Sequence, residues 1–94
     1  MAKAPILKTT GGDLLRSDIR VSAIRQNGMT QLRLATEDGV GVRRALLTQF
    51  RGDREWSVSF LEPGQTRASD GMIEHGLSRA RAAELAQCWV INGY

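Results

Sequence analysis

The Asn27-Gly28 pair restricts the fold more than any other two residues in the chain. Asparagine and glycine tolerate the positive φ angles of a type I′ turn, whose twist matches that of two antiparallel strands. Apolar and polar side chains alternate on both sides of the pair, which is typical of half-buried strands. A two-residue turn also fixes the register. The facing pairs are then Ile24 and Gln31, Ala23 and Leu32, Ser22 and Arg33, Val21 and Leu34, Arg20 and Ala35, and Ile19 and Thr36.

This register sorts the hairpin into two faces, because successive side chains of a strand point to opposite sides. The apolar face contains Ile19, Val21, Ala23, Leu32 and Leu34. The opposite face contains Arg20, Ser22, Gln26, Gln31 and Arg33, together with the apolar Ile24 and Met29. Since the turn and the alternation agree, we predict a hairpin whose apolar face lies on the core.

Residues 42–50 fit two patterns. Apolar side chains recur at helical spacing from Val42 onward, whereas Leu46, Thr48 and Phe50 alternate as in a strand. The flanking glycines and the strand expected next along the chain favour a strand here.

Large apolar and small polar residues alternate over residues 56–60, which predicts a half-buried strand. Residues 51–54 are expected to join it to the preceding strand as a hairpin turn. Residues 62–71 have the composition of a long polar loop, and residues 72–75 are expected to form a short return strand.

A helix is predicted over residues 79–91. Ser78 suits its N-cap, because a serine hydroxyl accepts a hydrogen bond from a free backbone N–H of the first turn. Gly93 is placed to end the helix. The apolar stripe at helical spacing comprises Ala82, Leu85, Ala86 and Trp89. The predicted fold class is α+β: an antiparallel β-meander of three to five strands packed by one C-terminal α-helix.

The 94 residues suffice for one domain. We expect residues 1–13, punctuated by Pro5 and a glycine pair, to be a flexible arm, and residues 14–94 to be a single α+β domain. With Cys88 as the only cysteine, no internal disulfide forms. The sequence has neither a signal-peptide pattern nor an apolar run of membrane-spanning length, so we expect a cytoplasmic protein and no membrane partner.

Residues for catalysis or cofactor binding are few. His75 is the only histidine and has no cysteine neighbour, which argues against a zinc site. A triad of Ser78, His75 and Asp70 is formally available, but capping already explains Ser78. The glycines do not form a phosphate-binding loop. We therefore expect no catalysis, no metal and no cofactor.

Arginine supplies most of the positive charge, since Lys3 and Lys8 are the only lysines among 13 basic side chains. Its planar donor fork suits phosphate and carboxylate groups, although a GC-rich genome also favours arginine codons. Arginines in the first turn of the predicted helix oppose the helix dipole and fit an N-terminus that faces an anion. The predicted binding residues are Arg20, Ile24, Gln31, Arg33, Arg43, Arg44, Arg79 and Arg81.

Two functions fit these residues. The layout over residues 17–92, a three-stranded sheet backed by a C-terminal helix, resembles the arm-type DNA-binding domains of phage integrases. That resemblance implies that the sheet residues Arg20, Gln31 and Arg33 touch DNA, with Arg43 and Arg44 on phosphates.

The second function is a protein-directed inhibitor or adaptor of the kind carried by phages and mobile elements, and anti-CRISPR-type inhibitors share this size and character. Ten acidic residues beside the basic ones disfavour a phosphate-binding surface and favour a protein partner. We therefore expect the partner to be a protein or a protein–nucleic acid complex, with DNA or RNA as the alternative. An unpaired edge strand would also allow a homodimer.

Overall fold

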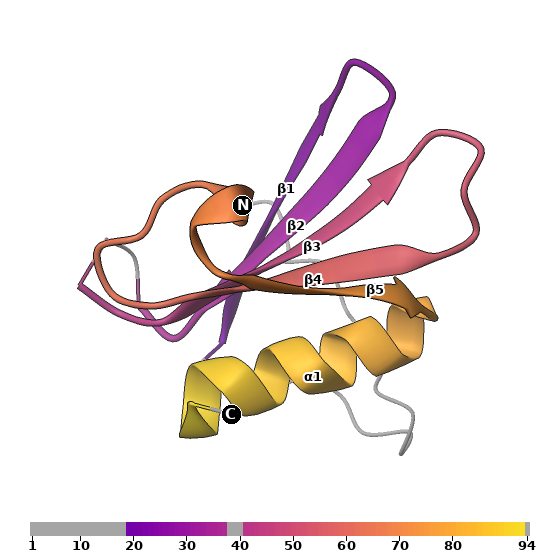
Figure 1. The fold of residues 1–94 in the computed structure, drawn as a ribbon. Helices are drawn as coiled ribbons and strands as arrows, with labels where there is room; N and C mark the ends of the chain where they lie inside the picture. The colour runs from indigo at the N-terminus through magenta and orange to yellow at the C-terminus, as the bar shows by residue number, and fades with distance from the viewer. Residues whose placement is uncertain (1–18, 38–40, 94) are drawn as a thin grey trace.

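The computed structural model describes residues 19–37 and 41–93, which form one antiparallel sheet and one long helix (Figure 1). The strands lie side by side in chain order. They are β1 (Arg20–Gln26), β2 (Met29–Ala35), β3 (Arg44–Phe50), β4 (Trp56–Leu61) and β5 (Met72–Leu77). A short 3-10 helix, η1 (Ala68–Asp70), precedes β5, and α1 (Arg79–Asn92) follows it. The predicted α+β meander packed by a C-terminal helix is confirmed, with five strands in the sheet.

The first hairpin forms in the predicted register. Asn27 and Gly28 have φ angles of 51° and 75°, the left-handed conformation that the turn requires. All the predicted pairs from Ile24 with Gln31 through Arg20 with Ala35 are present, and the paired strands end there. The turn and the apolar pattern therefore both determine the register of this hairpin.

Residues 44–50 form the predicted strand, β3, at the centre of the sheet. The consecutive residues from Arg44 to Thr48 are all buried. A strand buried on both faces needs apolar residues at successive positions, and this removes the simple alternation of a half-buried strand. The ambiguous sequence pattern of this segment has that cause.

The two outer strands of the described sheet differ in regularity. β1 pairs with β2 without interruption, whereas a register shift separates two parts of the β4–β5 pairing. Gly76 has a φ of 72° at this irregularity, a conformation that glycine adopts without strain. A bulge of this kind discourages a further strand from pairing with β5. Pairing of an edge strand with a second copy stays a prediction.

Both predicted caps of α1 are present. The hydroxyl of Ser78 accepts a hydrogen bond from the backbone N–H of Arg81 at 3.1 Å. Gly93 adopts the left-handed conformation, and its N–H donates to the carbonyl of Trp89 at 2.8 Å. No helix among residues 19–37 and 41–93 is long and apolar enough to cross a membrane.

The predicted apolar stripe of α1 needs correction. Trp89 is partly buried and packs against the core as predicted, whereas Leu85 is only partly buried and is not part of the core cluster. The fully buried side chains of α1 are mostly small. The buried residues of α1 are Ala82, Ala83, Ala86 and Val90.

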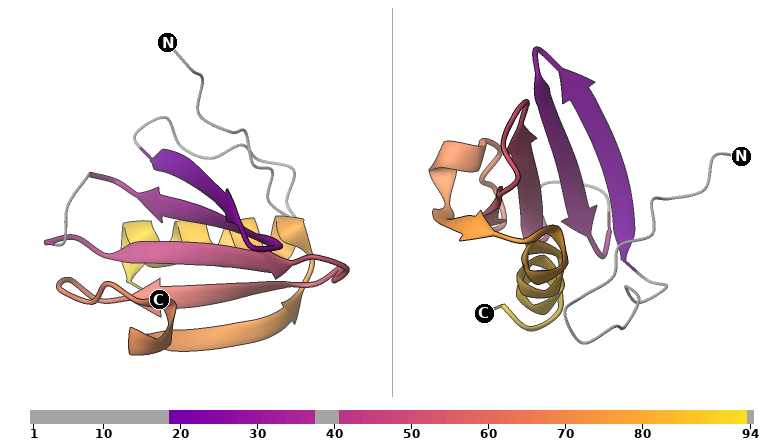
Figure 2. Two further views of the ribbon diagram at one scale, coloured as in Figure 1. Left: turned by 90° about the horizontal axis from the view of Figure 1, so that it is seen from above. Right: turned by 90° about the vertical axis from the view of Figure 1, so that its right-hand side faces the viewer.

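The core lies between α1 and one face of the sheet, mainly beneath β3 and β4 (Figure 2). Leu34 pairs with Ala45, and Leu47 pairs with Val58, so these side chains point to the same side. None of the four has an exposed surface. The predicted arm at residues 1–13 lies outside the described residues.

Candidate functional site

The candidate site is the face of the sheet that points away from α1, which we call the open face. The register assigns its members, because directly paired residues of neighbouring strands point to the same side. They are Arg20, Ser22, Ile24, Gln26, Met29, Gln31, Arg33, Ala35, Arg44, Leu46, Thr48, Phe50, Ser57, Ser59, Leu61, Ile73 and His75. None of these residues carries a carboxylate.

Three large apolar side chains are exposed on the open face. Ile24 has 37% of its surface exposed, Ile73 40% and Phe50 56%. They lie on β1, β3 and β5, so they are spread across the open face and do not form one continuous patch. Arg20 and Arg33 are also exposed on this face. It therefore combines apolar contact area with positive charge.

The centre of the open face is buried although α1 lies on the other side of the sheet; the loop between β4 and β5, which contains η1, lies on this side (Figure 1). Leu46 and Ser59 are nearly inaccessible, and Thr48 is buried beside them. The hydroxyl of Thr48 accepts a hydrogen bond from the side-chain amide of Gln31 at 3.3 Å. These contacts hold the centre of the open face in place, and the exposed apolar side chains lie around this buried centre.

The loop between β4 and β5 is attached at one end of the open face. Arg44 is buried there and donates a hydrogen bond from its guanidinium to the carbonyl of Gln65. Within the loop, the carboxylate of Asp70 accepts hydrogen bonds from the backbone N–H groups of Arg67 at 2.8 Å and Thr66 at 3.0 Å. These bonds, that of Arg67 first, lower the pKa of Asp70. Arg44, a predicted binding residue, thus helps to hold the loop in place.

Arg43 lies at the other side of the sheet and contacts the end of α1. Its Nε donates to the carbonyl of Trp89 at 3.1 Å, and its Nη2 donates to the carbonyl of Ile91 at 3.3 Å. The guanidinium carbon is 6.0 Å from the ring centre of Trp89. A cation at a helix C-terminus satisfies free carbonyls and complements the dipole. Arg43 therefore stabilises the helix end.

The two arginines of the first helical turn also have partners within the fold. The guanidinium carbon of Arg79 lies 5.8 Å from the ring centre of Trp56, and Arg81 forms an ion pair with Glu84. Both are on α1, away from the open face. The predicted binding residues that share the exposed part of the open face are Arg20, Ile24, Gln31 and Arg33.

His75 does not belong to the triad that the sequence made formally available. Its Nδ1 is 2.9 Å from the hydroxyl of Ser57, at the border of the open face. Ser78 caps α1, and Asp70 binds backbone N–H groups of its own loop. The three residues of that triad therefore do not converge. Ser57 and His75 instead offer hydrogen-bonding groups beside the apolar residues.

Sequence reasoning missed Phe50 and Ile73 as members of the candidate site. The alternation of Leu46, Thr48 and Phe50 placed these three on one side of a strand. This alternation did not show that Phe50 is exposed whereas Leu46 and Thr48 are buried. That distinction depends on where the helix and the loop cover the sheet, which the pattern of one strand does not contain.

The described residues hold no group of three or more His, Cys, Asp or Glu side chains placed to bind a metal ion. Cys88 is a free, partly buried thiol on α1. Comparisons with protein-family models, with curated proteins and with solved structures find no match. The surface chemistry of the described residues therefore has to indicate the function.

Proposed function

We propose that this chain is a non-catalytic binding protein that recognises another protein with the open face of its sheet. The observation that carries the proposal is that Ile24, Phe50 and Ile73 are all exposed on one face, whose strand residues carry no carboxylate. Apolar anchors surrounded by polar groups are the usual composition of a protein–protein contact. Such a protein acts by occupying a surface of its partner, as an inhibitor or an adaptor.

A protein partner fits the distribution of arginines better than a nucleic acid does. Affinity for nucleic acid depends on several phosphate contacts made together. Arg43, Arg44 and Arg79 contact other parts of the fold, as does Arg81. The resemblance to integrase arm-binding domains assigned two of these to phosphates. Their internal contacts favour the protein-directed function.

The open face also has the amino-acid types that protein interfaces use most. Aromatic residues, methionine and arginine are enriched in such contacts, whereas aspartate and glutamate are depleted. Phe50, Met29 and Arg33 represent the three enriched types here. We interpret the chain as an inhibitor or adaptor of the type carried by phages and mobile elements, acting in the cytoplasm.

Capture of a partner from nuclease-treated host lysate tests this function. The wild-type chain is compared with the double variant Phe50→Ala/Ile73→Ala. Removing a buried interface anchor costs about 2 kcal/mol or more, so the double variant is expected to lose the partner.

Met72→Ala is the matched control, because Met72 is apolar and 81% exposed but pairs with Phe60 on the opposite face. This control should capture the partner as the wild type does. Capture that disappears after nuclease treatment would indicate that the chain binds nucleic acid instead of a protein. Capture that the double variant retains would move the interface off the open face.

A further inference from the structure

The two hairpin turns at one end of the sheet meet and form a second candidate site. The backbone N–H of Arg51 donates to the carbonyl of Gly28 at 2.6 Å, which joins the β3–β4 turn to the β1–β2 turn. Residues of both turns line a shallow hollow at this contact. The position of one turn is therefore fixed relative to the other.

Four polar side chains of this region form what we call the tip cluster: Arg25, Thr30, Gln49 and Arg51. Arg25 pairs with Thr30, which pairs with Gln49, so these three point to the same side of the sheet. The amide of Gln49 donates to the carbonyl of Asp53 at 2.9 Å, which orients it. The cluster thus combines two guanidinium groups, a hydroxyl and an amide from three strands and a turn.

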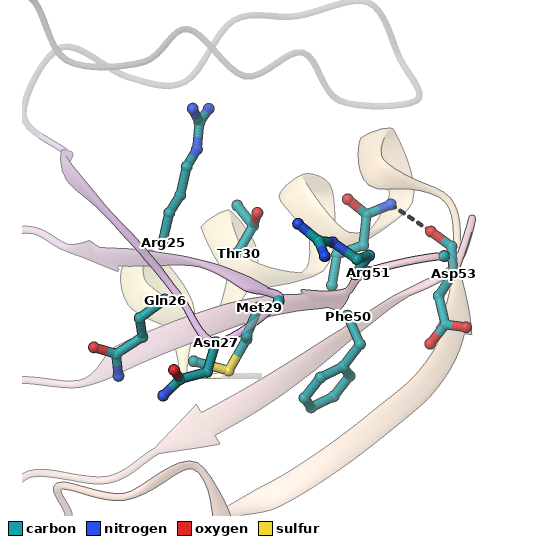
Figure 3. A pocket seen from close by; sticks show the side chains of 11 residues that line it. Arg25, Gln26, Asn27, Met29, Thr30, Phe50, Arg51 and Asp53 are labelled. Carbon is teal, nitrogen blue, oxygen red and sulfur yellow. Dashed lines mark hydrogen bonds between the residues drawn. The ribbon is translucent and has the colours of Figure 1, made fainter.

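The two sides of the turns differ in chemistry. In Figure 3, Arg25, Thr30 and Arg51 point to one side. Met29 and Phe50 point to the other side and belong to the open face. The tip cluster is therefore separate from the open face and depends on different residues.

The positive charge of the tip cluster is not neutralised within the described part of the chain. Neither Arg25 nor Arg51 has a side-chain hydrogen bond or an ion pair there. Asp53 is the acidic residue that lines the same hollow. Its carboxylate points away from the two guanidinium groups (Figure 3). Two like charges on one small surface repel each other, and an anion bound between them would offset that repulsion.

We propose that the tip cluster binds a phosphomonoester dianion. A phosphomonoester carries close to two negative charges at neutral pH and offers three acceptor oxygens. Arg25 and Arg51 match that charge, and Thr30 adds a hydroxyl donor. A carboxylate has two oxygens and one charge, which a single arginine fork satisfies. A phosphodiester likewise carries one charge. The site goes beyond the proposed function, since it uses none of the open-face residues.

Titration of the ¹⁵N-labelled full chain with inorganic phosphate tests the site by NMR. Sodium chloride at equal ionic strength is the reference, and dimethyl phosphate and acetate stand for the diester and the carboxylate. Phosphate is expected to produce saturating shifts at the backbone amides of Arg25, Thr30, Gln49 and Arg51. Dimethyl phosphate and acetate should bind at least about tenfold more weakly than phosphate, because each carries one negative charge fewer.

Variants distinguish this site from general attraction by a basic protein. Arg25→Ala and Arg51→Ala should each weaken phosphate binding about tenfold, by loss of charge-assisted hydrogen bonds. Arg33→Ala removes the same charge from the opposite face of the same hairpin and should leave the phosphate affinity nearly unchanged. Each variant is compared with the wild type by its NMR spectrum to verify the fold.

Three results would overturn the proposal. The first is an absence of saturating shifts at the tip cluster. The second is an equal loss of affinity in Arg33→Ala. The third is binding of acetate or dimethyl phosphate as tight as that of phosphate. None of these results bears on protein capture by the open face, so the two proposals fail independently.

Discussion

The two faces of the sheet use the same strands for different purposes. On the face toward α1, Leu34, Leu47 and Val58 have no exposed surface. On the open face, Ile24 and Phe50 remain exposed although they lie in the same strands or beside them. The covered face is stabilised by packing against a helix, whereas the open face leaves apolar area exposed, which we propose is used to bind a partner. We infer that stability and binding are assigned to opposite faces.

Arginines show the same division. Arg43 caps α1, and Arg44 is buried against the loop between β4 and β5. Arg33, by contrast, is exposed on the open face. These arginines therefore differ in role according to which parts of the fold cover them. In the amino-acid composition each contributes one positive charge, and only the contacts in the folded structure distinguish their roles.

The largest expected difference between the faces concerns core truncation. Leu47→Ala should lower the free energy of unfolding by about 2–5 kcal/mol, since it leaves a cavity beneath α1. Ile24→Ala on the open face should change it by about 1 kcal/mol or less, because only part of this side chain is buried. Urea denaturation measures both. Similar losses in the two variants would contradict the division of roles.

Arg44 tests whether the loop at the end of the open face depends on a buried side chain. Arg44→Ala should cost about 2 kcal/mol, because the carbonyl of Gln65 loses its donor and the alkyl chain no longer packs. Arg44→Met retains the packing and should cost less. Arg33→Ala serves as the exposed control, with a change of about 0.5 kcal/mol or less. An equal loss of stability in Arg33→Ala and Arg44→Ala would contradict a special role for the buried arginine.

The Ser78 cap contributes to the element that covers the core. Ser78→Ala should lower the free energy of unfolding by about 1 kcal/mol, because the N–H of Arg81 loses its acceptor. Ser78→Asp retains a capping oxygen and should restore most of the loss. Thermal unfolding followed by circular dichroism distinguishes the two. An unchanged midpoint in Ser78→Ala would mean that the cap is not needed.

The smallest expected effect is the pH dependence of the loop. The pKa of Asp70 is lowered by the N–H groups of Arg67 and Thr66. Its contribution to stability is therefore complete above the ordinary value of 3.8 and is lost as the pH falls through the lowered pKa. The stability difference between wild type and Asp70→Asn should shrink below about pH 4. A difference that grows in acid would contradict this sign.

Local signals in the sequence predicted most of the fold. The Asn27-Gly28 turn fixed the register of β1 and β2, and Ser78 and Gly93 set the ends of α1. These features succeed because each depends on residues close in the chain. The stripe of α1 was only partly right, since Ala83 and Val90 are buried and Leu85 is not. Which residues of α1 are buried depends on how the helix and the sheet pack together, which α1 does not determine alone.

The candidate site was less accessible to sequence reasoning. Alternation placed Arg20, Ile24, Gln31 and Arg33 on one face, and the structure brings them together there. Arg43 and Arg44 are adjacent in the chain, so the alternation of a strand already sends their side chains to opposite sides of the sheet. The sequence did not indicate that each of them hydrogen-bonds to another part of the fold. Phe50 was missed because its exposure depends on elements distant in sequence.

Site-specific photocrosslinking in host cells shows whether the open face itself contacts a protein. p-Benzoylphenylalanine is placed at Phe50 on the open face in one sample, and at Arg81 on the outer surface of α1 in another. Recognition through the open face predicts a covalent adduct with one protein partner from position 50 and none from position 81. An adduct from position 81 alone, or one from position 50 that contains only nucleic acid, would contradict it.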